Sequence, residues 1–183
     1  MKSVCLYCGS QPGHEPGHSQ VARALGTGIA AAGWRLVYGA GDHGLMGEAS
    51  RAARARGGAV TGFIPRHLVE LEVANRDLTE LVITDTMHER KKLMLGNADG
   101  VVALPGGPGT LDELVEVLTW RYLGLHRKPV VLINASGYWD PLLALFEHME
   151  TGGFVSSNFL GGLTLASTAE EALRALSSGM KAA

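Results

Sequence analysis

Two glutamates and the glycine-rich segment before them give the strongest chemical signal in this sequence. Glu113 and Glu116 are three residues apart, which places both carboxylates on one face of a helix. The segment 105–110 (Pro-Gly-Gly-Pro-Gly-Thr) lies between an apolar run of strand type and a stretch with apolar residues at helical spacing. Backbone N–H groups at such a strand-to-helix turn bind anions, and we expect a phosphate there. Carboxylates beside a bound phosphate suggest acid–base or cation-stabilising chemistry on a sugar.

The glycine-rich segment lacks the lysine that a nucleoside triphosphatase would need. Gly109 and Thr110 are followed by Leu111, so the sequence predicts phosphate binding without nucleoside triphosphate hydrolysis. A structural interpretation is also open, because Thr110 and Glu113 match the T-x-x-E capping box. In that motif Glu113 would only satisfy a backbone N–H group.

A second polar cluster, residues 87–92 (Met-His-Glu-Arg-Lys-Lys), opens the helix expected at 88–97. Arg90 offers a planar fork for phosphate or ribose oxygens, and Lys91 offers a point charge. The basic run is also compatible with a solvated helix start. Basic residues near a helix N-terminus oppose the helix dipole, however, which suggests that an anionic group compensates them.

Residues 39–44 (Gly-Ala-Gly-Asp-His-Gly) match the G-x-G-x-x-G pattern of dinucleotide-binding proteins. The pattern follows the second expected strand, whereas the dinucleotide motif follows the first. The next strand, ending at Pro65, offers no acidic residue for a ribose diol. Arg66 could face a 2′-phosphate. We favour a tight turn that helps to wall the ligand pocket over NAD(P) binding.

The cysteines and histidines show no metal-binding pattern. Cys5 and Cys8 form a C-x-x-C, but on a strand their odd spacing places the side chains on opposite faces. We therefore expect two small core residues rather than a zinc or redox site. His14 and His18 are separated by Pro16 and Gly17, which argues against a helical pair. We predict no metal and no cofactor.

The elements that would position these residues alternate between strand and helix. Strands are expected at 4–8, 35–38, 59–64, 81–84, 101–104, 129–133 and 163–165, and helices follow at about 21–32, 45–56, 88–97, 111–122, 141–149 and 169–176. Residues 9–17 are expected to form a turn, and 68–77 an irregular segment. The alternation predicts one α/β domain over residues 1–183, with a mostly parallel sheet and helices on both faces. Both glycine-rich loops follow strands, so both lie at the ligand-binding edge of the sheet.

Composition narrows the class of protein. The 183 residues are 46% hydrophobic, which is enough for a sizeable core. The sequence contains no run of 18 apolar residues, so we expect no membrane span. The N-terminus lacks the apolar segment of a signal peptide, and cysteine is rare, so we expect a cytoplasmic protein. A formal net charge of -2 argues against general nucleic-acid binding. Small anionic ligands remain possible because they need only a local cluster of donors.

Together these motifs resemble the Lonely Guy phosphoribohydrolases, the cytokinin-activating enzymes once labelled lysine decarboxylases. Residues 105–113 are similar to the family's P-G-G-x-G-T-x-x-E, 8–10 to its C-G-S, 44–47 to its G-L-M-G, 87–91 to its M-x-x-R-K, and 119–129 to its T-W-x-Q-L-G-x-H-x-K-P. The sequence departs at Ala40, where glycine is usual, at Tyr122, where glutamine is usual, and at Pro108, which fills a variable position. Lysine decarboxylation needs pyridoxal phosphate on a Schiff-base lysine, and nothing in the sequence provides that site.

The resemblance implies a Rossmann-like three-layer homodimer that hydrolyses the N-glycosidic bond of N6-modified AMP, and often of AMP itself. It also implies that Arg90 and Glu113 are the catalytic pair. The residues implied to bind substrate are Ser10, Gly41, Glu72, Met87, Lys91, Pro105, Gly106, Gly107, Gly109, Thr110 and Glu116. A non-catalytic nucleotide or cofactor carrier of the same fold, of which the molybdenum-cofactor carriers are an example, is the alternative. The helix from Leu111 to Leu125 carries Trp120, Tyr122 and several Leu and Val residues, which favours a dimer built partly on that helix. A helix buried within one subunit is the alternative.

Overall fold

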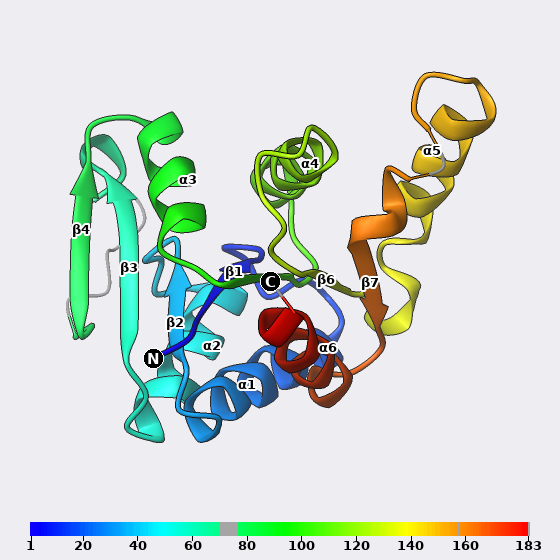
Figure 1. Ribbon diagram of the computed structural model, residues 1–183. Helices are drawn as coiled ribbons and strands as arrows, with labels where there is room; N and C mark the ends of the chain where they lie inside the picture. Colours follow the sequence, from blue (N-terminus) through cyan, green and yellow to red (C-terminus); the bar gives the residue numbers. More distant parts are fainter. Residues whose placement is uncertain (70–76, 157, 183) are drawn as a thin grey trace.

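The computed structural model describes residues 1–69, 77–156 and 158–182, and these form one seven-stranded sheet between two layers of helices (Figure 1). The strands are β1 (Ser3–Tyr7), β2 (Arg35–Tyr38), β3 (Val60–Pro65), β4 (Glu80–Thr84), β5 (Gly100–Ala103), β6 (Val130–Ile133) and β7 (Leu163–Ala166). The helices are α1 (Pro16–Ala31), α2 (Gly44–Ala55), α3 (Met87–Gly96), α4 (Pro108–Tyr122), α5 (Asp140–Thr151) and α6 (Ala169–Ala182). Short 3-10 turns lie at Arg66–Leu68, Ala135–Gly137 and Leu160–Gly162.

The sheet has the strand order β4-β3-β2-β1-β5-β6-β7, and all of its strand pairs are parallel. The chain builds outward from β1 to β4 and then returns to β5 on the other side of β1. This reversal leaves a crevice outside the carboxyl ends of β1 and β5, where doubly wound folds bind ligands. The predicted α/β architecture is therefore confirmed, and both glycine-rich loops lie at this edge.

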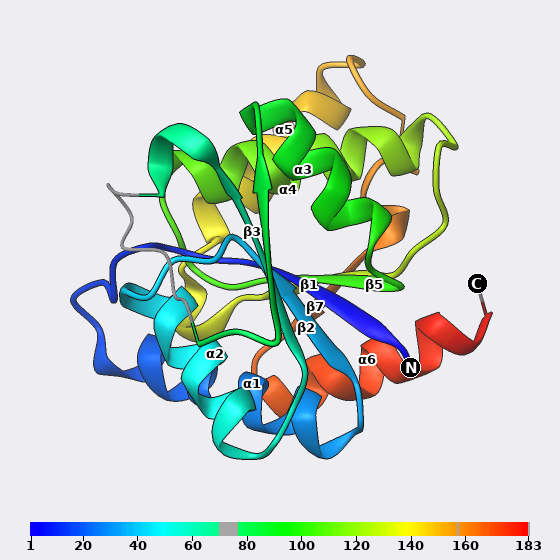
Figure 2. The same ribbon diagram turned by 90° about the vertical axis from the view of Figure 1, so that its left-hand side faces the viewer.

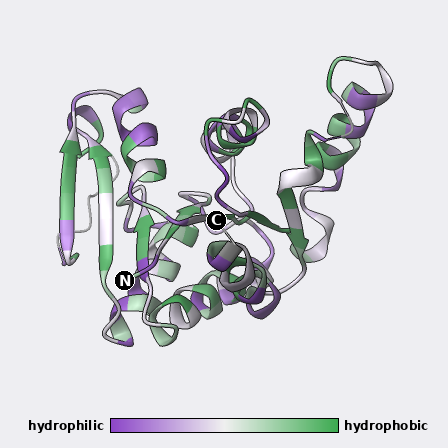
Figure 3. Cartoon of the chain, in the orientation of Figure 1, coloured by the Kyte–Doolittle hydropathy of each residue, from purple (hydrophilic) through white to green (hydrophobic). Residues whose placement is uncertain are grey.

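Helices cover both faces of the sheet. Figure 2 shows α3, α4 and α5 on one side and α1, α2 and α6 on the other. Each layer closes its own apolar cluster against the strands. Hydrophobic residues accordingly run along much of the strands (Figure 3). The two cysteines divide as their spacing predicts: Cys5 lies in the α3–α4–α5 cluster, and Cys8 lies in the α1–α2–α6 cluster. Both are free thiols.

Two helix starts differ from the sequence-based boundaries for the same physical reason. Helix α1 begins at Pro16, inside the expected turn, and α4 begins at Pro108, before the expected start. Proline fits the first turn of a helix because its missing N–H group would have no intrahelical partner there. Helix α6 also continues beyond the expected end at Leu176, to Ala182. No helix in the described part of the chain is long and apolar enough to cross a membrane.

Candidate active site

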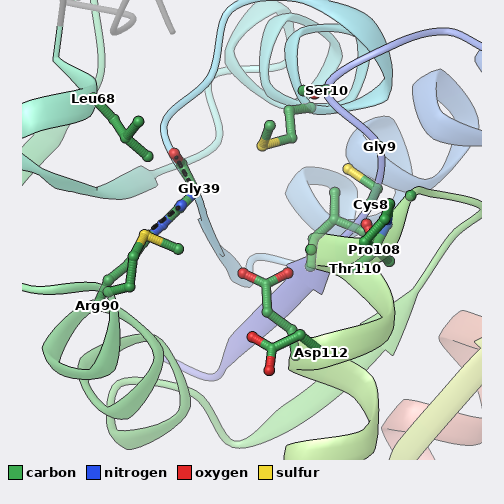
Figure 4. Close-up of a pocket in the computed structure, with 15 residues that line it drawn as sticks. Cys8, Gly9, Ser10, Gly39, Leu68, Arg90, Pro108, Thr110 and Asp112 are labelled. Carbon is green, nitrogen blue, oxygen red and sulfur yellow. Dashed lines mark hydrogen bonds between the residues drawn. The ribbon is translucent and has the colours of Figure 1, made fainter. Parts of the chain in front are cut away.

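A cavity of about 230 Å³ opens at the carboxyl edge of the sheet (Figure 4). Its walls come from β1 and the loop after it, the loop after β2 with the start of α2, the 3-10 turn after β3, the first turns of α3 and the first two turns of α4. The described lining residues are Leu6, Cys8, Gly9, Ser10, Gly39, Met46, Leu68, Met87, Arg90, Gly107, Pro108, Gly109, Thr110, Asp112 and Glu113. Residues that are distant in sequence thus meet at the edge where the topology predicts a ligand site.

Arg90 lies on one wall of this cavity, where helix α3 and a hydrogen bond to Gly39 hold it. Helix α3 begins after Thr86, whose side chain accepts a hydrogen bond from the Glu89 N–H group at 3.1 Å. Arg90 lies in the first turns and is only 5% exposed. Its Nη2 donates to the carbonyl oxygen of Gly39 at 2.9 Å. A Cβ atom on Gly39 would lie 1.9 Å from Nη2, so any larger residue here would displace the Arg90 guanidinium from its present position.

The Gly39 contact also explains the G-x-G-x-x-G match. The pattern follows β2 and leads into α2, as the sequence indicates, and its first glycine accommodates a buried arginine. The structural interpretation of the turn as a wall of the pocket is therefore correct, since Gly39 lines the cavity.

Glu113 lies on the facing helix and does not cap it. The N-cap of α4 is Gly107, and no side chain caps that position. Thr110 is then already inside the helix, so the capping-box interpretation is wrong. The Glu113 side chain lines the cavity instead. Its charge also acts on the end of β1: burial raises the pKa of the Cys8 thiol well above its usual value, and the Glu113 carboxylate raises it further.

The glycines of the glycine-rich segment differ in their surroundings: Gly106 is closely packed, whereas Gly107 and Gly109 are not. A Cβ atom on Gly106 would lie 2.1 Å from Oγ1 of Thr110, so the turn needs glycine there. A Cβ atom on Gly107 or Gly109 would meet nothing within 4 Å, which means that both face open space. The first backbone N–H groups of α4 have no partner within the helix, and the positive end of the helix dipole lies beside these two glycines. The geometry therefore fits an anion on the α4 N-terminus.

Lys91 is engaged by α4 rather than by the cavity. Its Nζ lies 2.9 Å from Oδ2 of Asp112 and 3.0 Å from Oε1 of Glu116. The Lys91 side chain is 8% exposed. Burial lowers its pKa, but the hydrogen bonds and charges of the two carboxylates outweigh burial, and the pKa is raised overall. Neither Lys91 nor Glu116 is among the lining residues, which differs from their expected contact with substrate.

The remaining expected residues divide among neighbouring sites. Ser10, Met87, Gly107, Gly109 and Thr110 line the cavity with Arg90 and Glu113. Gly41 lines an adjacent cavity with His43, and Pro105 and Gly106 line another with Tyr138. Glu72 lies outside the described residues.

Sequence reasoning missed Asp112, which both lines the cavity and binds Lys91. Its position next to Glu113, facing a basic cluster, is the signal that could have found it. Cys8 was expected only in the core, and it also lines the cavity.

Metal and pyridoxal chemistry find no support in the described residues. Across 1–69, 77–156 and 158–182, no group of three or more His, Cys, Asp or Glu side chains could hold a metal ion. The described lining of the cavity contains no lysine for a Schiff base, and Lys128 lies elsewhere, bonded to the carbonyl oxygens of Leu95 and Ala98. The residues present do not fit a pyridoxal-dependent decarboxylase.

Known proteins match this chain over most of its length. A protein-family model described as "Possible lysine decarboxylase" matches residues 46–176. The cytokinin riboside 5'-monophosphate phosphoribohydrolase of Mycobacterium marinum is 43% identical over 177 residues, covering 97% of this chain and 94% of that protein. The protein of the same name from Rhodococcoides fascians is 46% identical, covering 85% of this chain and 79% of its own. A solved structure of the Moco carrier protein from Chlamydomonas reinhardtii shares the fold, with a TM-score of 0.76, 21% identity and coverage of 100% and 99%.

Proposed function

The chain belongs to the family of cytokinin riboside 5'-monophosphate phosphoribohydrolases, and we propose that it hydrolyses the N-glycosidic bond of nucleoside 5'-monophosphates. Its substrates are N6-modified AMP and AMP itself, and its products are the free base and ribose 5-phosphate. The observation that carries this proposal is the cavity in which Arg90 and Glu113 line the same space as the N-terminus of α4.

Each group in the cavity has a distinct task in this reaction. The 5'-phosphate binds the N-terminus of α4, around Gly107, Gly109 and Thr110, and its binding energy orients the sugar. Breaking the C1′–N9 bond develops positive charge on the ribose. The Glu113 carboxylate stabilises that charge and orients or deprotonates the attacking water. Arg90, held by Gly39, fixes the substrate against this carboxylate.

We assign Lys91 and Glu116 a positioning task in place of the substrate contact expected from sequence. Lys91 joins α3 to α4 through Asp112 and Glu116, one residue away from Arg90 on α3 and from Glu113 on α4. The ion pairs therefore set the distance between the two walls of the cavity. Because a misplacement of about 1 Å can reduce catalysis by about 100-fold, this support matters for the rate.

We also propose that the protein acts as a homodimer in the cytoplasm. Large apolar side chains are exposed around the C-terminal end of α4 and near the end of α5, with Tyr122 at 42%, Leu123 at 64%, Leu125 at 69% and Phe154 at 88%. Exposed apolar surface of this kind is typical of a subunit interface. Light scattering at micromolar concentration should give twice the mass of the chain. A monomeric mass would contradict the dimer.

Product analysis tests the activity directly. The purified protein is incubated with AMP and with isopentenyl-AMP, and the free base and ribose 5-phosphate are quantified. We expect release of both products in equal amounts. Tight binding of either nucleotide without product release would instead support the carrier alternative.

A further inference from the structure

A second cavity of about 610 Å³ lies beside the candidate active site, and the proposed reaction does not use it. It lies between the loop after β1, the first turns of α1 and α2, the loop after β5 with the start of α4, and the turn after β6. Gly9, Ser10, Gly107 and Pro108 line both cavities. A phosphate bound at Gly107, on the N-terminus of α4, would therefore have one cavity on either side.

The walls of this second cavity suit a flat, uncharged group. Its lining includes Leu45, the ring of Tyr138 and three prolines, Pro12, Pro105 and Pro108. Two contacts orient the Tyr138 ring: its hydroxyl donates to the Gly106 carbonyl oxygen at 2.7 Å, and it packs edge-to-face with the Trp139 ring, with centroids 4.9 Å apart. Rigid proline and aromatic surfaces of this kind pack against planar rings. The described lining contains no lysine or arginine, so a further phosphate would find no countercharge there.

His18 provides a polar atom at this cavity. The residue is 6% exposed, and its Nε2 makes no hydrogen bond within the described part of the chain. Its nearest charged neighbour is Oε2 of Glu15, at 3.8 Å, while Oε1 of Glu15 accepts a hydrogen bond from the Ser136 hydroxyl at 2.6 Å. The His18 and Tyr138 rings also form a T-shaped pair, with centroids 5.6 Å apart. Buried polar atoms are normally paired, so His18 is suited to a hydrogen bond with a bound ligand, donated by its Nε2–H group where the ligand offers an acceptor.

We propose that this cavity binds the second ester group of a nucleoside 5'-phosphodiester, and that this group is a planar ring with a hydrogen-bonding edge for His18. The inference rests on the proposed function, because it places the phosphate at the N-terminus of α4 and the nucleoside in the Arg90–Glu113 cavity. The reaction itself is unchanged. The oxygen of water bonds to C1′, the C1′–N9 bond breaks, and the proton goes to the base. The second product is then a ribose 5-phosphodiester.

Calorimetry on the full chain with three ligands tests this inference. The ligands are AMP, the 4-nitrophenyl ester of AMP, and ADP. Packing of the ring against Tyr138 and the prolines should make the ester bind about three- to tenfold more tightly than AMP. ADP should bind no more tightly than AMP, because the second cavity lacks a countercharge. An ester that binds more weakly than AMP, or an equal gain with ADP, would overturn the inference.

The variant His18→Leu tests the polar contact while preserving side-chain bulk. We expect the tighter binding of the ester to be largely lost, whereas AMP affinity stays within about twofold, which also reports that the variant is folded. His148→Leu, at an exposed position on α5, is the matched control and should keep both affinities. A full ester advantage in His18→Leu, or equal losses for both ligands, would contradict the proposed contact.

The two proposals can fail separately. If AMP is hydrolysed but the ester binds no better than AMP, the second cavity is not a ligand site and the proposed function stands. If AMP binds without hydrolysis and the ester binds more tightly, the phosphodiester site stands and the activity fails. A protein that binds neither ligand would overturn both.

Discussion

Substitution of Glu113 by glutamine separates its chemical task from a structural one. Glu113 is well inside α4, whose N-cap is Gly107, so no cap is lost and the free energy of unfolding should change by less than about 1 kcal/mol. The change removes the negative charge and the base while keeping the shape of the side chain. We expect kcat for AMP to fall by about 100-fold or more, which corresponds to about 2.7 kcal/mol of transition-state stabilisation. AMP affinity should largely survive, because the backbone donors of the phosphate site are unchanged.

Asp112→Asn is the matched control for this measurement. Asp112 lines the same cavity one residue away, but its carboxylate is bound to Lys91. We expect a smaller loss of kcat than in Glu113→Gln. The assay measures kcat, melting temperature and AMP affinity on one preparation of each variant. A folded Glu113→Gln variant with near-native kcat would refute the catalytic assignment, and equal losses in both variants would show that the summed charge of the cavity matters rather than Glu113.

Three further predictions concern the phosphate, Arg90 and His126. Adenosine should have a kcat/KM far below that of AMP, because it lacks the group that binds the α4 N-terminus; equal values would contradict the phosphate site. Gly39→Ala should lower kcat by about tenfold or more, since its Cβ would displace the Arg90 guanidinium, whereas Gly96→Ala on the exposed face of α3 should keep full activity. Burial lowers the pKa of His126 from its usual 6.5. In addition, its Nδ1 accepts a hydrogen bond from the Lys128 backbone N–H group at 3.2 Å, and a proton on Nδ1 would break this bond. The unfolded chain therefore binds the proton first, and the free energy of unfolding should fall as pH drops below 6.5, by less in His126→Asn than in the original chain when both are measured by urea denaturation.

The fold could be predicted from sequence because its signals are local and repeated. Strand β2 occupies the predicted residues Arg35–Tyr38, and every other strand lies within one or two residues of its predicted position. The opposite faces of Cys5 and Cys8 follow from the two-residue period of a strand alone. Helix starts were less accurate, since a proline reads as a loop residue unless its tolerance in the first helical turn is considered.

The site could be predicted only as far as residue types and motifs allow. The motifs identify Arg90, Glu113 and the glycine-rich segment, and the structure places all three around one cavity. The partners of Lys91 could not be predicted, because its contacts with Asp112 and Glu116 depend on how α3 and α4 lie beside each other on one face of the sheet (Figure 2). A contact between residues more than 20 positions apart leaves no period or spacing in the sequence.

The contact between α3 and α4 connects the residues that the motifs identify with the ion pairs that only the structure shows. Arg90 and Lys91 are adjacent on α3, where Arg90 lines the cavity and Lys91 forms the ion pair. On α4, Glu113 lines the cavity, and the adjacent Asp112 both lines it and pairs with Lys91. The Lys91 side chain is 8% exposed, and its charge is balanced by the carboxylates of Asp112 and Glu116, whose side chains are 59% and 25% exposed. The pair therefore resists any sliding of one helix along the other. Arg90 also donates a hydrogen bond to Gly39 in the loop after β2. The proposed catalytic arginine is therefore held both by α3 and by the carboxyl edge of the sheet, and the position of Glu113 relative to the proposed phosphate site is set by α4 itself.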